Sequence, residues 1–190
     1  MSPGRRATLL LGCGFGLAVA VRVLIGGREV ARSGPAGLVF GACLLALCWA
    51  ARGSVRASGR AALIGLGGGL FLCLPALFGA LSGSALLGAH RPGGSFVGWA
   101  LVVAFVAIAE ELFLRGALYD AVTGWLGETA AILVGAVAFA GLHVPLYGWH
   151  VVPLDLAVGL WLGALRRWAR TPAAPAVSHT LADLLGWWLR

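Results

Sequence analysis

The sequence contains no lysine, asparagine or glutamine, and charged residues make up only 11% of its 190 positions. A soluble domain averages about 25% charged residues, so this chain cannot build a surface that faces water on all sides. Its 60% hydrophobic content also excludes a disordered chain, which needs low hydrophobicity and high charge. The composition therefore excludes a soluble enzyme and an unfolded segment.

Clustered cysteines and a concentrated basic region are also missing. The four cysteines all lie within apolar stretches without CxxC spacing, which favours small buried side chains over disulfides or a zinc cluster. The formal net charge is +7. Most of the arginines that carry it lie in short gaps between apolar runs rather than on one face. We therefore expect no nucleic-acid partner.

Long apolar runs dominate what is present. Seven stretches are long enough to predict membrane-spanning helices, and they cover residues 7–26, 35–51, 61–83, 95–119, 129–147, 151–167 and 174–189. The predicted fold class is an all-α, polytopic transmembrane helix bundle with about seven spans, in contact with the lipid bilayer. We expect one integral domain, in which residues 1–94 supply N-terminal spans and residues 95–190 form the core that carries the chemistry.

The arginine distribution predicts how the bundle is oriented. With the N-terminus in the cytoplasm, eight arginines fall in inner segments and four in outer ones, the bias typical of cytoplasmic loops. Arg5 and Arg6 precede an apolar run, but the part of that run before Cys13 is too short for a signal peptide, and the run continues beyond this cysteine. We therefore expect a multi-pass protein of the inner (plasma) membrane with a cytoplasmic N-terminus.

Ionisable residues inside the predicted spans are the candidates for function, because a charge in lipid costs about 2.5–3.5 kcal/mol on insertion scales. Almost all of them lie in the second half of the chain. They are Glu110, Glu111, Arg115, His143, His179 and Asp183. Residues 1–94 are nearly free of such acids, which argues against a proton-coupled transporter with polar groups in both halves.

Helical spacing predicts pairs among these candidates. Glu111 and Arg115 are four residues apart, as are His179 and Asp183, so the members of each pair share a helix face. The pair of Glu111 and Arg115 is either part of a catalytic set or a structural clamp. This pairing leaves Glu110 without a partner and suits it to act as a general base.

The remaining polar residues within or beside the spans are given structural interpretations. Arg22 in the first span is expected to extend to the membrane interface or to pair with another helix. His150 and Asp155 fit a helix start or a wet loop, and Asp120 and Glu128 fit solvated span boundaries.

Three motifs follow one another along the second half of the chain. They are Glu-Glu-x-x-x-Arg at 110–115, Phe-x-x-x-His at 139–143 and His-x-x-x-Asp at 179–183. In this order on successive apolar helices they resemble the motifs of the CAAX prenyl protease and bacteriocin-processing family, also called the Abi or type II CAAX prenyl endopeptidase family. The resemblance covers roughly residues 95–190 and implies an intramembrane endopeptidase.

The resemblance also implies a role for each motif. Glu110 would activate a water molecule together with His143, while His179 and the residue four positions later would stabilise the oxyanion. That later residue is Asn in eukaryotic prenyl proteases and Asp183 here. Because an ionised Asp would repel an oxyanion, Asp183 must be protonated, hold His179 in its donor form, or ligate a metal. The oxyanion role therefore falls to His179.

A metal-dependent interpretation uses the same side chains. Glu110, His143 and His179 form a set of two histidines and one carboxylate of the kind that leaves zinc an open position for water. We favour a mechanism without a metal or another cofactor and keep zinc as the alternative.

The predicted function is hydrolysis of a peptide bond in a membrane-associated peptide or protein. A non-catalytic immunity or scaffold protein that binds a peptide in the same polar cavity is the alternative, and a proton-coupled transporter is less favoured. At 1.5 Å per residue, Glu110 and His179 lie toward the cytoplasmic side, and His143 joins them only if the turn at 119–129 projects about 10 Å into the cytosol. We predict this projection and a wet cavity that opens inward.

Overall fold

The computed structural model describes residues 2–51, 55–81 and 95–189, and every regular element within these ranges is helical. The all-α prediction is therefore confirmed. The helices are α1 (Pro3–Gly26), η1 (Gly27–Glu29), α2 (Gly34–Ala50), α3 (Gly59–Leu81), α4 (Phe96–Glu111), η2 (Leu112–Ala117), α5 (Leu118–Tyr147), η3 (Trp149–Val151), α6 (Val152–Ala169) and α7 (Ala173–Leu189). Each predicted apolar stretch corresponds to one α-helix, with η2 extending the fourth.

Serine side chains begin several of these helices. The hydroxyl oxygen of Ser33 accepts from the backbone N–H of Ala36 at the start of α2, and that of Ser95 accepts from Gly98 at the start of α4. Such caps satisfy backbone donors that have no partner within the first helical turn. Each of these helices therefore begins at the polar residue that precedes an apolar run.

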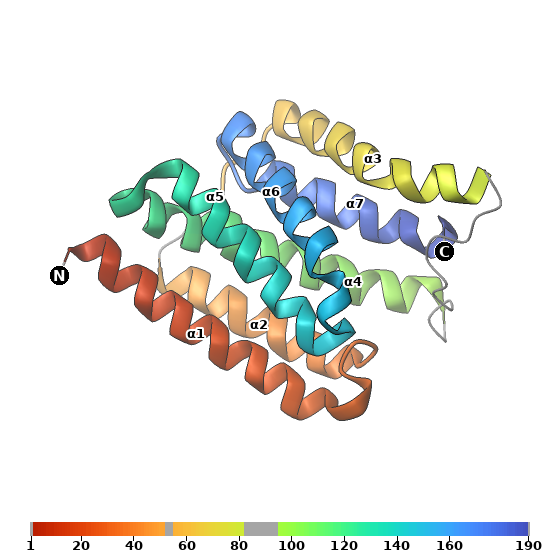
Figure 1. Cartoon of the computed structure of the whole chain (residues 1–190), viewed down its shortest axis with the longest axis horizontal. Helices are drawn as coiled ribbons and strands as arrows, with labels where there is room; N and C mark the ends of the chain where they lie inside the picture. Colours follow the sequence, from red (N-terminus) through yellow and green to blue (C-terminus); the bar gives the residue numbers. More distant parts are fainter. Residues whose placement is uncertain (1, 52–54, 82–94, 190) are drawn as a thin grey trace.

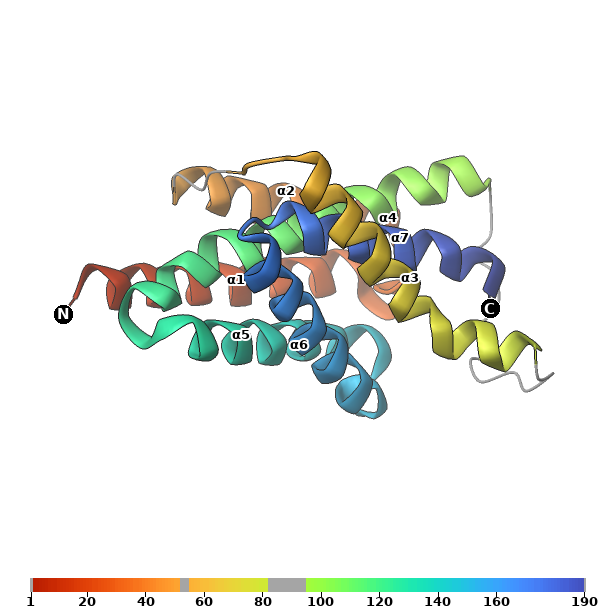
Figure 2. The same cartoon turned by 90° about the horizontal axis from the view of Figure 1, so that it is seen from above.

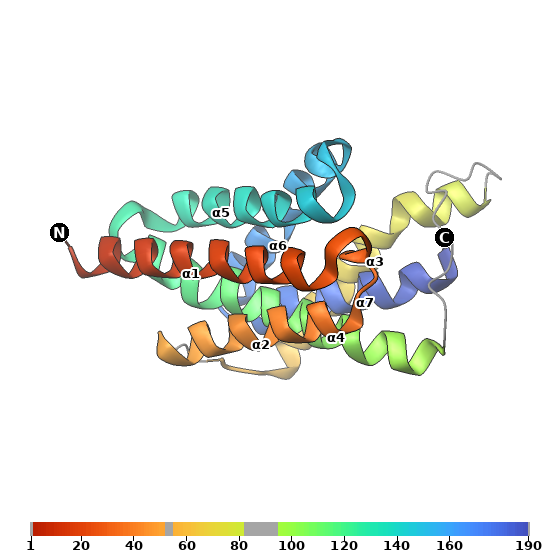
Figure 3. The same ribbon diagram turned by 90° about the horizontal axis from the view of Figure 1, so that it is seen from below.

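The predicted turn between the fourth and fifth spans is shorter than expected. The π-helix η2 continues the backbone hydrogen bonding of α4 into α5, so the fourth helical run does not end at residue 119. The chain reverses only at Gly127, where φ is 83° and ψ is 170°. Glycine suits this position because positive φ is unfavourable for residues that carry a Cβ atom. After Gly127, α5 runs back alongside α1 (Figure 3).

The α-helices form a bundle in which α4 and α7 are central (Figure 1). Helix α4 packs on α2 and α7, while α1 packs on α2 and α5, and α6 packs on α5. Helix α3 runs along the outer side of α7 (Figure 2). The N-terminus and the turn at Gly127 lie at one end of the bundle, and the C-terminus lies at the opposite end (Figure 1).

Apolar side chains cover the outside of the bundle, while several charged ones are buried inside it. Leu24 is 81% exposed and Leu63 is 72% exposed, whereas Glu111 is 0% and Arg115 is 1% exposed. This distribution is the reverse of that in a soluble protein, in which charged residues are almost never fully buried. The protein is therefore a membrane protein.

Three described helical segments are long and apolar enough to cross a membrane by length and composition. They are Pro3–Glu29, Gly59–Phe78 and Phe96–Tyr147, and the last contains both arms on either side of Gly127. The shorter helix α2 is also apolar. The predicted number of about seven crossings stays a prediction, as does the division of the chain at 94/95.

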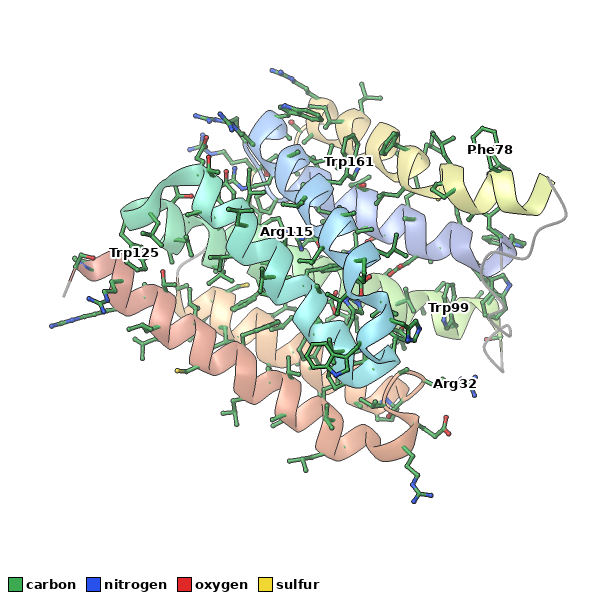
Figure 4. The ribbon with its side chains drawn as sticks, viewed as in Figure 1. Arg32, Phe78, Trp99, Arg115, Trp125 and Trp161 are labelled. Carbon is green, nitrogen blue, oxygen red and sulfur yellow. The ribbon has the colours of Figure 1, made fainter. Side chains whose placement is uncertain are left out.

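Charged residues collect at the end of the bundle that holds the N-terminus. Asp120 forms an ion pair with Arg166, and Glu128 forms ion pairs with Arg167 and Arg170. The side chains of Asp120 and Glu128 are 56% and 33% exposed, in keeping with the prediction that both are solvated. Arg28 in η1 and Arg32 shortly after it are exposed, and Arg32 lies at the opposite end (Figure 4). Several predicted features fall outside the described residues, namely the 94/95 boundary, the end of the 61–83 stretch, and the arginines at 52, 91 and 190.

Candidate functional site

The first motif lies where α4 passes into the π-helix η2. Glu110 and Glu111 end α4, and Arg115 lies within η2. The guanidinium Nη1 of Arg115 donates to Oε1 of Glu111 at 2.9 Å, which confirms the predicted pair. Single-turn π-helices within α-helices are frequent at functional sites. Arg115 lies in the middle of the bundle (Figure 4).

A close contact between α5 and α6 gives Arg115 its second acceptor. Nη2 of Arg115 donates to the backbone carbonyl of Gly159 at 3.1 Å. A Cβ atom on Gly159 would lie 2.7 Å from Cα of Ala136, so only glycine allows this approach of the two helices. Its carbonyl thereby satisfies a guanidinium that would be costly to bury alone.

Glu111 joins the first motif to the third. Its Oε1 atom lies 3.0 Å from Nδ1 of His179, in addition to its contact with Arg115. The Glu111 side chain is 0% exposed and that of His179 is 9% exposed. Because a carboxylate only accepts hydrogen bonds, Nδ1 of His179 is the donor. Glu111 at the end of α4 therefore connects this helix to η2 through Arg115 and to α7 through His179.

The second nitrogen of His179 faces the end of the third motif. Nε2 of His179 lies 3.5 Å from Oδ2 of Asp183, as the four-residue spacing predicted. The Asp183 side chain is 36% exposed, so this carboxylate lies at the more accessible edge of the cluster. Asp183 was predicted to be protonated, to hold His179 in its donor form, or to ligate a metal. The contact with Nε2 is the one expected if Asp183 holds His179.

The second motif contacts both of its neighbours through an aromatic ring. The Phe139 ring meets the imidazoles of His143 and His179 edge-on, at centroid distances of 4.6 Å and 5.3 Å. The guanidinium carbon of Arg115 lies 5.1 Å from the same ring centroid. Phe139 thus contacts both imidazoles and the Arg115 guanidinium and helps to fix their positions.

The backbone of α5 determines which nitrogen of His143 is free. Nδ1 of His143 lies 2.9 Å from the backbone carbonyl of Phe139, which can only accept. The proton of a neutral His143 therefore resides on Nδ1, and Nε2 keeps a lone pair for a substrate or a water molecule. The Phe-x-x-x-His spacing produces this orientation because the two residues are one helical turn apart.

Asp155 is a member of the cluster that the sequence analysis assigned to a helix start or a wet loop. It does lie in the first turn of α6, but its side chain is only 16% exposed and its Oδ2 atom is 3.7 Å from Nδ1 of His143. The helix-start alternative is therefore confirmed, and the wet-loop alternative is wrong. A single acid at a helix start gives no sequence signal for this contact, because the packing of α6 on α5 creates it. His150, in contrast, is exposed.

Glu110 has a partner, contrary to the prediction that it is left unpaired. Nη1 of Arg22 in α1 lies 3.5 Å from Oε1 of Glu110, with side-chain exposures of 10% and 4%. The alternative in which Arg22 pairs with another helix is thereby confirmed. The prediction was wrong for Glu110 because it considered only partners within the same helix. The sequence signal was the single arginine inside an otherwise apolar first span.

The structure thus gathers all six predicted site residues in the interior between α4, η2, α5 and α7. Electrostatic interactions connect Glu110 with His179 and Arg22, and connect His143 with His179, Arg22 and Arg115. Glu111 and Arg115 form the buried base of this cluster, while Asp183 and His143 lie nearer its edge. The cluster has the two imidazoles and the carboxylates that acid–base chemistry requires.

The geometry does not resemble a formed metal centre. Within the described residues, no group of three or more His, Cys, Asp or Glu side chains is placed to hold a metal ion. Glu110 is instead directed to Arg22, and the Nδ1 atom of His179 to Glu111. We therefore derive no chemical step through zinc and leave that alternative to experiment.

An apolar groove of about 520 Å³ runs beside the cluster, between α4 and α7. It is lined by Val55, Ile108, Leu112, Ala173, Ala176, Val177, Thr180, Leu181 and Leu184. The hydroxyl of Thr180 is buried and has no hydrogen-bond partner among the described residues. Three of these lining residues, Leu112, Thr180 and Leu184, directly follow Glu111, His179 and Asp183 in the sequence. An apolar chain seated in the groove would therefore lie next to the polar cluster.

The fold and the cluster define a class of protein, a helical membrane protein with acid–base groups buried in its interior. Residues 92–185 match the family described as Type II CAAX prenyl endopeptidase Rce1-like. That region holds all three motifs and confirms the resemblance to this family. At the level of the family, the match indicates a membrane-embedded protease. Searches of curated proteins and of solved structures found no match to the chain.

Proposed function

We propose that this protein is an intramembrane endopeptidase that hydrolyses a peptide bond by means of a water molecule activated by Glu110 and His143. The observation that carries the proposal is the convergence of the three motifs on one buried cluster, in which Glu111 contacts Arg115 and His179 and the Phe139 ring contacts both imidazoles. Such a cluster is costly to bury in a membrane protein, and it is retained where chemistry needs it.

The first chemical step assigns the water molecule to Glu110 and His143. Nε2 of His143 accepts one hydrogen bond from the water, since Nδ1 is engaged with the Phe139 carbonyl. The Glu110 carboxylate takes a proton as the water oxygen attacks the scissile carbonyl carbon. When the tetrahedral intermediate collapses, the C–N bond breaks and the proton held by Glu110 passes to the leaving amine.

His179 is the proposed donor to the oxyanion of that intermediate. Its Nδ1 donates to Glu111, so the group available for the oxyanion is Nε2, which faces Asp183 in this structure. This role requires His179 to carry a proton on both nitrogens. The carboxylates of Glu111 and Asp183, one beside each nitrogen, favour this positively charged form. Glu111 and Arg115 would position the imidazole without touching the substrate.

The substrate is proposed to be a membrane-associated peptide or protein. The apolar groove between α4 and α7 supports this class, because it can hold an apolar segment beside the cluster without desolvating polar groups. A protein of the plasma membrane with a cytoplasmic N-terminus remains our proposal for location. The cluster of arginines at the N-terminal end of the bundle supports this orientation.

The experiment compares purified protein in detergent with its Glu110→Gln and His179→Ala variants on a peptide library that includes farnesylated CAAX peptides. We expect wild-type cleavage, a loss of at least about 100-fold for Glu110→Gln, and a loss of about 100- to 1,000-fold for His179→Ala. Glu29→Gln and His150→Ala change exposed residues of the same types and serve as matched controls.

Three outcomes decide between the candidate functions. Cleavage that persists in Glu110→Gln overturns the glutamate mechanism, and cleavage that stops with a chelator and returns with zinc moves the assignment to a metalloprotease. If wild type cleaves no peptide but binds one with an affinity that Glu110→Gln reduces, the protein is a peptide-binding scaffold.

A further inference from the structure

Arg22 is a buried cation on a helix outside the family-matched residues 92–185. Leu11, Ala18 and Arg22 are the buried residues of α1, and their spacing places them on one face of that helix. Phe15 lies between them in sequence and stacks on Phe113 of η2, with ring centroids 5.4 Å apart. This contact holds the inner face of α1 against the segment that follows Glu111.

The surroundings of Arg22 leave Glu110 as its counter-ion. The guanidinium lies 4.8 Å from the Phe40 ring centroid on α2, while Nη1 reaches Oε1 of Glu110 at 3.5 Å. Nε is buried without a hydrogen-bond partner among the described residues. A buried guanidinium loses its hydration and needs an opposite charge nearby. Glu110 provides this charge, since the other glutamate of the motif is bound to Arg115 and His179.

We propose that Arg22 is a positioning residue that holds the Glu110 carboxylate in the orientation from which it activates water, so that α1 completes a site otherwise built by residues 92–185. This proposal rests on the proposed function of Glu110 as base. Arg22 does not touch the substrate in this scheme. Each of the two adjacent glutamates thus has its own arginine, because Arg22 pairs with Glu110 and Arg115 pairs with Glu111.

The test compares Arg22→Lys and Arg22→Met in purified protein with Arg28→Met as the control, because Arg28 is an exposed residue of η1. We expect Arg22→Met to lower kcat about 10- to 100-fold with KM changed by less than about threefold, as expected for a group that acts on the base and not on substrate binding. Arg22→Lys restores kcat to within about tenfold of wild type, because lysine returns the positive charge. A kcat for Arg22→Met within twofold of Arg28→Met overturns the proposal.

A stability cycle tests the contact without relying on activity. Glu110→Gln leaves Arg22 buried without its counter-ion, so the double variant Arg22→Met/Glu110→Gln should melt at a higher temperature than Glu110→Gln alone. Equal melting temperatures for these two variants overturn the pairing. If Arg22→Met alone does not fold, Arg22→Gln replaces it in the kinetic comparison. Should Glu110→Gln keep full activity while the melting temperatures show coupling, the proposed mechanism fails and the pair of Arg22 and Glu110 stands as structural.

Discussion

Nδ1 of His179 lies 3.0 Å from Oε1 of Glu111, so the third motif is attached to the second glutamate of the first motif and not to the proposed base. The same oxygen accepts from Arg115 at 2.9 Å. The two adjacent glutamates therefore have different surroundings. Glu111 is fixed by two partners within the family-matched region, and Glu110 faces Arg22 from α1.

Glu111→Gln is expected to lower the free energy of unfolding strongly. The substitution leaves the fully buried Arg115 without its counter-ion, and losing one partner of such a pair costs about 3–5 kcal/mol in the free energy of unfolding. Thermal melting in detergent measures the effect. Glu29→Gln removes an acid from an exposed ion pair and should change the same quantity by less than about 1 kcal/mol.

The double variant Glu111→Gln/Arg115→Met separates stability from catalysis. Removing both charges should recover much of the stability lost in Glu111→Gln, because no unpaired charge stays buried. Peptide cleavage should stay low, since His179 has still lost the carboxylate that orients it. Full recovery of cleavage in the double variant would show that Glu111 and Arg115 are only a structural clamp.

His143→Ala is expected to lower kcat about 100-fold or more while leaving the melting temperature within a few degrees of wild type. The side chain accounts for one hydrogen bond to the Phe139 carbonyl, ring contacts with Phe139 and Tyr147, and the approach of Asp155, so we expect its removal to affect the water more than the packing. His150→Ala is the matched control because that histidine is exposed. Equal kcat values for the two variants would contradict the proposed role of Nε2.

Asp183→Asn should retain at least about a tenth of the wild-type kcat. The amide can still contact Nε2 of His179, and it adds an N–H donor where an ionised carboxylate would oppose an oxyanion. Asp183→Leu loses both properties and should lower kcat about 100-fold or more. The comparison uses initial rates on the best library peptide. A lower rate for Asp183→Asn than for Asp183→Leu would show that the negative charge itself is needed.

Two glycines in α3 provide a matched test of the packing that places His179. A Cβ atom on Gly69 would lie 2.8 Å from the backbone oxygen of Ser178, whereas one on Gly67 meets nothing within 4 Å. Gly69→Ala must therefore displace α7 beside His179, and we expect a destabilisation of about 1–3 kcal/mol with reduced cleavage. Gly67→Ala should be neutral or slightly stabilising. Thermal melting and cleavage of both variants check this, and equal behaviour would exclude the close packing of α3 on α7.

The proposed orientation predicts which ends of the helices a membrane-impermeant thiol reagent reaches. Arg32→Cys should be labelled in intact cells, whereas Arg6→Cys should be labelled only after the membrane is opened. Both arginines are exposed, and wild type provides the background from its own four cysteines. The reverse pattern would place the N-terminus outside the cell.

The sequence alone determined the class of the fold and named the residues of the candidate site. Apolar runs of about 20 residues with so few charges favour helices in lipid, because each helix satisfies its own backbone hydrogen bonds. An acid or histidine inside such a helix stands out as costly, which is why Glu110, Glu111, Arg115, His143, His179 and Asp183 could be named from spacing. The pairs of Glu111 with Arg115 and of His179 with Asp183 also follow from the local geometry of a helix.

Only the tertiary structure decided which motif contacts which. The attachment of His179 to Glu111, the approach of Asp155 to His143 and the pairing of Arg22 with Glu110 join residues 68, 12 and 88 positions apart. Such contacts depend on how helices pack, and packing is determined by features with no periodic signal, among them the close approach at Gly159 and the π-helix that carries α4 directly into α5. Helical periodicity specifies the face on which a side chain lies, but the side chain's partner depends on the other helix that packs against that face.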